Sequence, residues 1–179
     1  SVDLVRDAIR RGFSYGISFH VGSQCIDPDG YRLGFDLVRQ VLSGFDETPE
    51  CVDIGGGFPA DYVNSSGPDL GIYLTAITAE VASMNLPESC RLLCEPGRAI
   101  AADGESLVVQ IQLRKGNCLY LNDGMYGSMI EEKLGLRLPV RMVASRDFST
   151  DLLLYTAYGP TCDSLDVYPT PLELPADVQ

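Results

Sequence analysis

Apolar residues recur along the first hundred positions with two alternating periods. Some segments place them every three or four residues, as on one face of a helix, and others are short apolar runs that are typical of strands. The pattern predicts helices at 2–11, 31–42 and 70–84, and strands at 15–21, 50–54 and 91–94. The order helix, strand, helix, strand, helix, strand favours parallel βα units.

The pattern changes after Arg98. Apolar runs at 106–113, 118–121, 137–144 and 152–157 predict strands, and 128–134 predicts at most a short helix. A Lys-Gly-Asn turn separates the first two runs, and the proline-rich stretch 169–175 is typical of a loop that enters a further strand. We therefore expect two domains, an α/β domain at 1–100 and a mostly β domain at 101–179.

Composition narrows the classes of function. The net charge of −12 argues against nucleic acid, because a phosphate backbone prefers a basic surface. No apolar run approaches the roughly 18 residues of a membrane span, and the first residues lack a secretory pattern. The six cysteines form no CxxC pair, and with one histidine they give no zinc pattern, so no metal is predicted. These features favour a cytoplasmic protein with reduced thiols.

Polar and glycine residues follow each predicted strand of the α/β part. The first strand is followed by His20 and Ser23, the second by Gly55, Gly56 and Gly57, and the third by Glu95-Pro96-Gly97-Arg98. Functional groups of an α/β barrel lie at these carboxyl ends of the strands. Each group alone has an ordinary explanation, such as a turn or a capped loop. Together they suit a ligand with a phosphate, a protonated ring nitrogen and a flat ring, and a sugar phosphate also fits.

Five motifs, in order along the chain, resemble those of the pyridoxal-phosphate (PLP) decarboxylases that act on ornithine, lysine, arginine and diaminopimelate. They are FHVGS at 19–23, DIGGGFP at 53–59, CEPGR at 94–98, YLNDGMYGS at 120–128 and YGPTCDSLD at 158–166. The last motif is most similar to that of ornithine and lysine decarboxylases. The resemblance implies the C-terminal part of a PLP-binding (β/α)₈ barrel, followed by the start of an all-β domain.

The resemblance also implies roles for individual residues. The cofactor is PLP. His20 stacks on its ring, and Glu95 contacts the ring nitrogen. The phosphate is bound by Ser23, Gly57, Gly97 and Arg98, with Gly55 and Gly56 shaping the loop. Cys162 assists protonation after carbon dioxide leaves, and Asp163 binds the distal amine of a small-molecule substrate. The active site is shared in a homodimer. The implied reaction converts L-ornithine to putrescine in polyamine biosynthesis.

The sequence departs from the family pattern in two places. The family's Schiff-base lysine precedes the histidine motif, and neither lysine of this chain, Lys115 or Lys133, lies in a matching motif. We therefore expect the lysine outside this chain, and this chain alone to be inactive. An aspartate that many relatives carry after YGS has no clear match, although Glu131 or Glu132 could replace it. Lysine or diaminopimelate decarboxylation and an inactive regulatory homologue remain alternatives.

Overall fold

The computed structural model describes residues 2–178, which form two compact units. The α/β unit contains the residues up to Asp61 together with Ser66–Gly104. The β unit contains Tyr62–Ser65 and the residues from Glu105 onward. Each unit buries its own cluster of apolar side chains, so each has a separate core.

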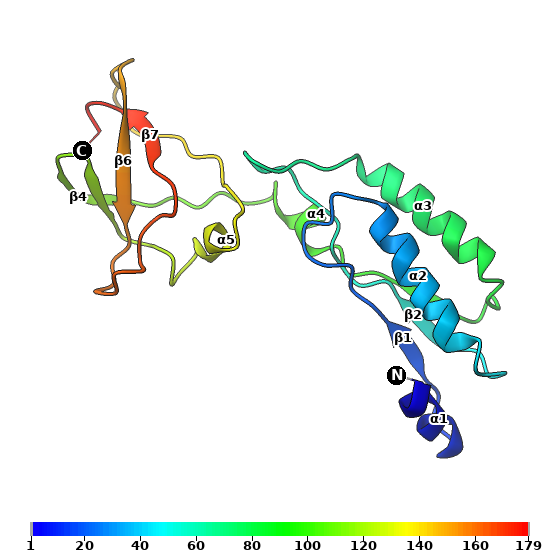
Figure 1. Ribbon diagram of the computed structural model, residues 1–179. Helices are drawn as coiled ribbons and strands as arrows, with labels where there is room; N and C mark the ends of the chain where they lie inside the picture. The colour runs from blue at the N-terminus through cyan, green and yellow to red at the C-terminus, as the bar shows by residue number, and fades with distance from the viewer. Residues whose placement is uncertain (1, 179) are drawn as a thin grey trace. The chain divides into compact units, whose positions relative to one another are not determined.

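A parallel sheet with the strand order β1-β2-β3 is the base of the α/β unit (Figure 1). Its elements in chain order are α1 (Val2–Arg10), β1 (Gly16–Ser18), α2 (Asp29–Leu42), β2 (Cys51–Asp53), α3 (Leu70–Ser83), β3 (Arg91–Leu93) and α4 (Gly97–Ala101). The six predicted helices and strands are all present, which confirms the βα alternation. The strands are shorter than their apolar runs because the last residues of each run turn into the loops that follow.

Helices α2 and α3 lie side by side and supply much of the core of this unit (Figure 1). The buried side chains come from α2, β2, the loop after β2, and α3: Tyr31, Phe35, Val38, Val52, Ile54, Phe58, Tyr73 and Ile77. Their helical positions are spaced by three or four residues, as the sequence predicted. Arg39 joins the two helices, because it forms an ion pair with Glu80 and donates to the Ser83 hydroxyl at 2.6 Å.

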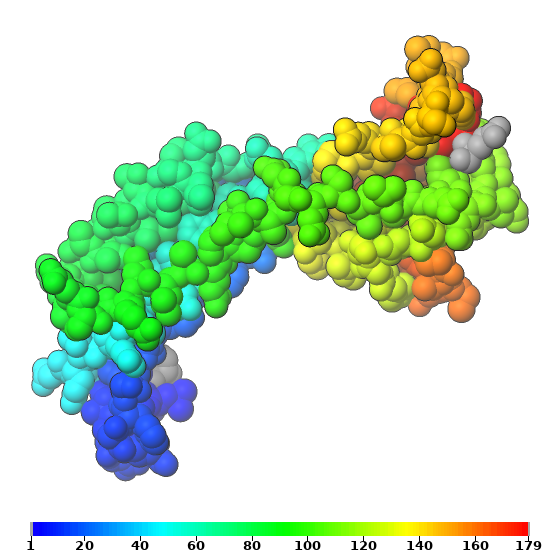
Figure 2. Space-filling model, turned by 180° about the vertical axis from the view of Figure 1, so that it is seen from behind, coloured from blue at the N-terminus to red at the C-terminus, as the bar shows by residue number. Residues whose placement is uncertain are grey.

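Strand β3 is the exposed part of this sheet. Among the described residues it pairs only with β2, and Leu92 and Leu93 are 47% and 40% exposed. Figure 2 shows the green segment that contains β3 and α4 uncovered on the face turned to the viewer. An open edge of this kind presents unpaired backbone groups, so it is a surface on which further strands can add.

The β unit contains a sheet in the order β4-β5-β6-β7. Its elements are β4 (Ile111–Lys115), β5 (Cys118–Leu121), α5 (Ile130–Lys133), β6 (Leu152–Tyr158) and β7 (Leu172–Pro175). Strands β4 and β5 form a hairpin whose turn residue Gly116 has φ +57°, and β6 pairs parallel with β5 and antiparallel with β7. The expected turn and short helix are therefore present.

Three predictions for this half are wrong. Strand β4 begins at Ile111, five residues later than expected, and 137–144 is not a strand. The backbone N–H groups of Arg137 and Leu138 donate to the side chains of Asn64 and Glu132, at 2.9 and 2.6 Å, so they are not available to a sheet. The stretch expected as a loop contains β7, whose only partner among the described residues is β6; an edge strand tolerates its terminal proline.

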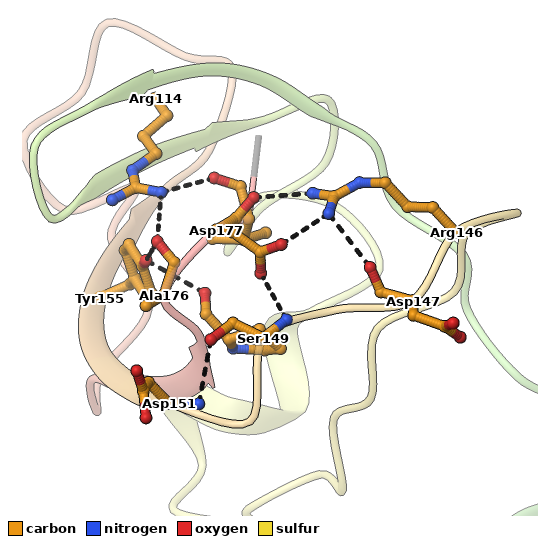
Figure 3. A network of polar contacts seen from close by, with 10 residues as sticks. Arg114, Arg146, Asp147, Ser149, Asp151, Tyr155, Ala176 and Asp177 are labelled. Carbon is orange, nitrogen blue, oxygen red and sulfur yellow. Dashed lines mark hydrogen bonds and ion pairs between the residues drawn. The ribbon is translucent and has the colours of Figure 1, made fainter.

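Two arginines hold the C-terminal end of the β unit (Figure 3). Arg114 donates to the carbonyl oxygens of Ala176 and Val178 at 2.8 and 2.7 Å. Arg146 pairs with the carboxylate of Asp177 at 2.6 Å, and that carboxylate also accepts from the Ser149 N–H at 3.0 Å. These bonds satisfy carbonyl groups that follow the last strand, so residues 176–178 are fixed against the sheet.

Candidate functional site

The three strand ends of the α/β unit are joined by backbone hydrogen bonds beyond the strands themselves. The Phe19 N–H donates to the Asp53 carbonyl at 3.0 Å, Ile54 donates to Leu93 at 3.0 Å, and Glu95 donates to the Gly55 carbonyl at 2.8 Å. These bonds bring the predicted residues of all three motifs to one edge of the sheet. We call this group the strand-end cradle; its members are His20, Ser23, Gly55, Gly56, Gly57, Glu95, Gly97 and Arg98.

The three glycines form the middle of the cradle because no other residue fits. Gly55 and Gly57 have φ of +64° and +104°, which strongly favours glycine. A Cβ atom added to Gly56 would lie 2.6 Å from the Glu95 carbonyl oxygen and 3.4 Å from Nε2 of His20. The absence of side chains therefore lets the ends of the first and third strands approach across the second.

His20 is held in one orientation by the loop that follows it. Its Nδ1 accepts the Gly22 N–H at 2.9 Å, which leaves the proton of the neutral imidazole on Nε2. Gly22 makes this turn with φ +99°. The His20 side chain and the neighbouring Ser23 are both exposed. An exposed ring fixed through one nitrogen can present a flat face to a planar ligand.

The residues after β3 contribute a carboxylate and a guanidinium. Glu95 is exposed, and Arg98 is half-buried and already engaged in contacts of its own. The N–H of Gly97 donates to the Glu95 carbonyl at 2.8 Å, so in this structure it is not directed at a ligand. An added Cβ at Gly97 would meet nothing within 4 Å. The contribution of Gly97 is thus open space rather than a donor.

Two buried tyrosines and one glutamine support the cradle, and sequence reasoning missed all three. The Tyr31 hydroxyl donates to the Gly56 carbonyl at 3.0 Å, and the Tyr73 hydroxyl donates to the Cys25 carbonyl at 2.8 Å. Burial raises the pKa of both phenols, so they remain donors. Gln24 exchanges two hydrogen bonds with the backbone of Ala60. For the two tyrosines, the signal in the sequence was a hydroxyl-bearing residue on an otherwise apolar helix face.

The second group of predicted residues lies on the exposed loop after β6 in the β unit. Cys162 and Asp163 are both exposed. The Asp163 carboxylate accepts the Leu165 N–H at 2.8 Å and the Tyr126 hydroxyl at 3.0 Å. These two donors, in that order, hold its pKa below the ordinary value. The side chain is therefore an oriented, ionised carboxylate.

Asp166 fixes this loop from beneath and was not singled out from the sequence. It is 2% exposed. One carboxylate oxygen accepts the Met125 N–H at 2.8 Å, and the other accepts the N–H and hydroxyl of Thr161 at 3.0 and 2.6 Å. Burial opposes ionisation, but the hydrogen bonds from Thr161 and Met125 outweigh it and lower the pKa of Asp166. The loop that carries Cys162 is thus tied to the loop after β5.

Two other carboxylates of the β unit serve the fold. Asp123 accepts the N–H groups of Gly124 and Ser128 at 2.7 and 3.1 Å, within its own turn. Glu132 is 5% exposed and accepts the Tyr168 hydroxyl and a backbone N–H. A buried acid with these partners is not available to a substrate amine, so Glu132 does not replace the aspartate missing after YGS.

Comparison with known proteins identifies the family. The model described as "Pyridoxal-dependent decarboxylase, pyridoxal binding domain" matches residues 13–102, which contain the whole strand-end cradle. The chain belongs to the pyridoxal-dependent decarboxylase family. Its cofactor is therefore PLP.

Individual relatives agree with this assignment. The chain is 32% identical to an ornithine decarboxylase of Caenorhabditis elegans, over 92% of this chain and 43% of the relative. It is also 32% identical to antizyme inhibitor 2 of Xenopus laevis, over 89% and 39%. A lysine/ornithine decarboxylase of Vibrio vulnificus, solved with cadaverine, matches 97% of this chain and 49% of its own with a TM-score of 0.80 and 30% identity. The chain thus spans less than half the length of these relatives.

The chemical groups of the strand-end cradle fit PLP. Ser23 and Arg98 offer a hydroxyl and a guanidinium to a phosphate, and the glycines, which lack side chains, leave room for it. His20 and Glu95 are exposed after β1 and β3, and Gly56, which follows β2, lies between them. No other ligand class is needed to account for this set of groups.

Membrane-spanning helices and metal clusters are both absent from residues 2–178. No helix in that range is long and apolar enough to cross a membrane. Within the same residues, no group of three or more His, Cys, Asp or Glu side chains is placed to hold a metal ion.

Proposed function

We propose that the protein that carries this chain catalyses PLP-dependent decarboxylation of a basic amino acid, with L-ornithine as preferred substrate and putrescine as product. The proposal rests above all on one observation. Gly56 packs between the backbone carbonyl of Glu95 and the imidazole of His20, so the residues that carry a carboxylate and a flat ring meet at a glycine loop. The same residues lie within the matched pyridoxal binding domain.

We assign the PLP contacts within the cradle as follows. His20 offers a ring face to the cofactor, in the orientation fixed by Gly22. The carboxylate of Glu95 accepts a hydrogen bond from the ring nitrogen and holds the proton there. Ser23, Gly57 and Arg98 bind the phosphate, Gly97 leaves room for it beside Arg98, and Arg98 supplies the charge. Gly55 and Gly56 keep the loop close to the sheet.

PLP, when bound, supplies an electron sink for the electron pair left on the α-carbon when carbon dioxide departs. The proton on the ring nitrogen makes that sink effective, and Glu95 keeps the proton in place. We assign to Cys162 the return of a proton to the α-carbon. In a homodimer with shared active sites, the loop that carries Cys162 serves the neighbouring subunit. A cytoplasmic location and a role in polyamine biosynthesis belong to the same proposal.

Substrate choice is assigned to Asp163. Its carboxylate is exposed, ionised and oriented by Tyr126 and Leu165, which suits an ammonium group at the far end of an amino acid. Ornithine and lysine both carry such a group, and the Vibrio relative was solved with the diamine cadaverine. The loop motif resembles those of ornithine and lysine decarboxylases alike, and we prefer ornithine because relatives at least 30% identical to this chain include ornithine decarboxylases.

The decisive experiment supplies ornithine, lysine and diaminopimelate separately to the protein with PLP and measures carbon dioxide and amine release. We expect putrescine release from ornithine at the highest kcat/KM. Cys162→Ala should lower kcat at least tenfold, about 1.4 kcal/mol in the barrier. Cys118→Ala, which changes a half-buried thiol of β5, is the matched control and should leave kcat unchanged. Release of no amine from any of the three would instead support an inactive regulatory homologue.

A further inference from the structure

The carboxylate of Asp163 has a cation beside it that belongs to the protein itself. The Nζ atom of Lys133, at the end of α5, lies 4.0 Å from the centroid of the Tyr126 ring. An ammonium within about 6 Å of an aromatic centroid is attracted to the ring. The hydroxyl of the same ring donates to Asp163 at 3.0 Å. Tyr126 thus connects a cation on its face with an anion at its edge.

The other lysine of the chain provides a comparison within the same unit. Lys115 also lies over a tyrosine, but its Nζ is 5.7 Å from the centroid of the Tyr120 ring, at the hairpin of β4 and β5. Three groups lower the pKa of Asp163. The Leu165 N–H contributes most and the Tyr126 hydroxyl next, and the Lys133 ammonium lowers the pKa further. Lys115 does not act on that carboxylate. Only one of the two lysines is therefore electrically coupled to it.

We propose that Lys133 lowers the affinity for basic substrates, because its ammonium competes with the distal ammonium of a basic amino acid for the carboxylate of Asp163. This inference rests on the proposed function, because it takes Asp163 as the group that binds the distal amine. Lys133 supplies a positive charge in the segment where a second carboxylate would strengthen binding of a diamine. This charge makes the site less negative and therefore lowers its affinity for doubly cationic ligands.

The size of the effect follows from the exposure of both side chains. Asp163 and Lys133 are exposed, so water and salt screen their interaction. Two unit charges roughly 8 Å apart change a binding constant by about two- to threefold in a water-like dielectric at low salt, where the Debye length greatly exceeds that separation. At about 0.5 M salt the same change should nearly vanish.

The test compares four proteins: wild type, Lys133→Gln, Lys133→Arg and Lys115→Gln. KM and kcat are measured with ornithine and with lysine, and the Kd of putrescine is measured by calorimetry, at low and at high salt. We expect Lys133→Gln to lower KM and the putrescine Kd about two- to threefold at low salt, with kcat unchanged. Lys133→Arg, which keeps the charge, and Lys115→Gln, which removes a distant charge, should match wild type.

Two results would overturn the inference. The first is a KM and a putrescine Kd that Lys133→Gln leaves unchanged or raises. The second is an equal effect of Lys115→Gln, which would indicate a change in net charge alone. Failure of the proposed function is a separate result, namely no carbon dioxide from any basic amino acid. In that case the putrescine Kd still decides, since a decrease on Lys133→Gln supports the charge competition and an unchanged value refutes it.

Discussion

Replacement of Asp166 by asparagine tests how the loop of Cys162 is held. The substitution keeps the size of the side chain and removes one acceptor and the charge. Asp166 accepts three hydrogen bonds, one on one oxygen and two on the other, and is 2% exposed. Whichever way the asparagine amide turns, its NH₂ group faces a backbone N–H, of either Met125 or Thr161. A backbone donor beside the buried amide is therefore left without a partner.

The cost can be estimated from these contacts. An unpaired buried donor costs about 1–3 kcal/mol, and bonds to a charged acceptor are worth more than bonds to a neutral one. We expect Asp166→Asn to lower the free energy of unfolding by about 2–4 kcal/mol at neutral pH. Movement of the side chain cannot relieve the loss, because the carboxylate packs tightly against Gly124 and Gly159. A Cβ atom on either glycine would already overlap it.

The assay is equilibrium urea unfolding of the wild-type protein and the variant, followed by circular dichroism, from neutral to acid pH. The folded-state pKa of Asp166 is below its ordinary value of 3.8. The stability it contributes is therefore fully present above that value and is lost as the pH falls through the lowered pKa. The two proteins should differ most at neutral pH and converge at low pH.

Asp163→Asn is the matched control, because it removes an exposed carboxylate from the same loop. It should change the free energy of unfolding far less than Asp166→Asn and should act on substrate KM instead. Equal stability of wild type and Asp166→Asn at neutral pH would refute the reasoning. So would a difference that persists unchanged to the lowest pH at which the protein folds.

Two other predictions concern the cradle and the C-terminal end. Gly56→Ala should weaken PLP binding at least tenfold in a fluorescence titration, since the added Cβ meets a carbonyl oxygen at 2.6 Å. The control is Gly71→Ala in helix α3, where an added Cβ meets nothing within 4 Å. This substitution should instead stabilise the protein by about 0.5–1 kcal/mol. The Arg146 guanidinium, with help from the Ser149 N–H, lowers the pKa of Asp177, so the thermal midpoints of wild type and Asp177→Asn should differ at neutral pH and converge below 3.8. Unchanged PLP affinity of Gly56→Ala would contradict the first prediction. Thermal midpoints of wild type and Asp177→Asn that stay equal at all pH values would contradict the second.

The sequence by itself determined the α/β unit and the chemistry of its strand ends. Helix and strand periods are local properties, and positions 2–93 show them clearly. Residues directly after parallel strands must meet at one edge, so the order of the motifs along the chain is enough to group His20, Gly55–Gly57 and Glu95. The motif resemblance then named PLP, which the family match supports.

The tertiary structure decided which partner each polar group takes. Arg137 and Leu138 lie in a β-like run, but side chains distant in sequence accept their N–H groups, and no strand forms there. The sequence alone suggests that Glu132 is a surface charge, but in the fold it is buried and accepts hydrogen bonds from the Tyr168 hydroxyl and the Leu138 N–H. Asp166 is one of two acids in its motif, and only the fold brings three donors to it. Local pattern fixes the period of the backbone, whereas the burial and pairing of a hydrogen-bonding group depend on residues brought to it by the fold.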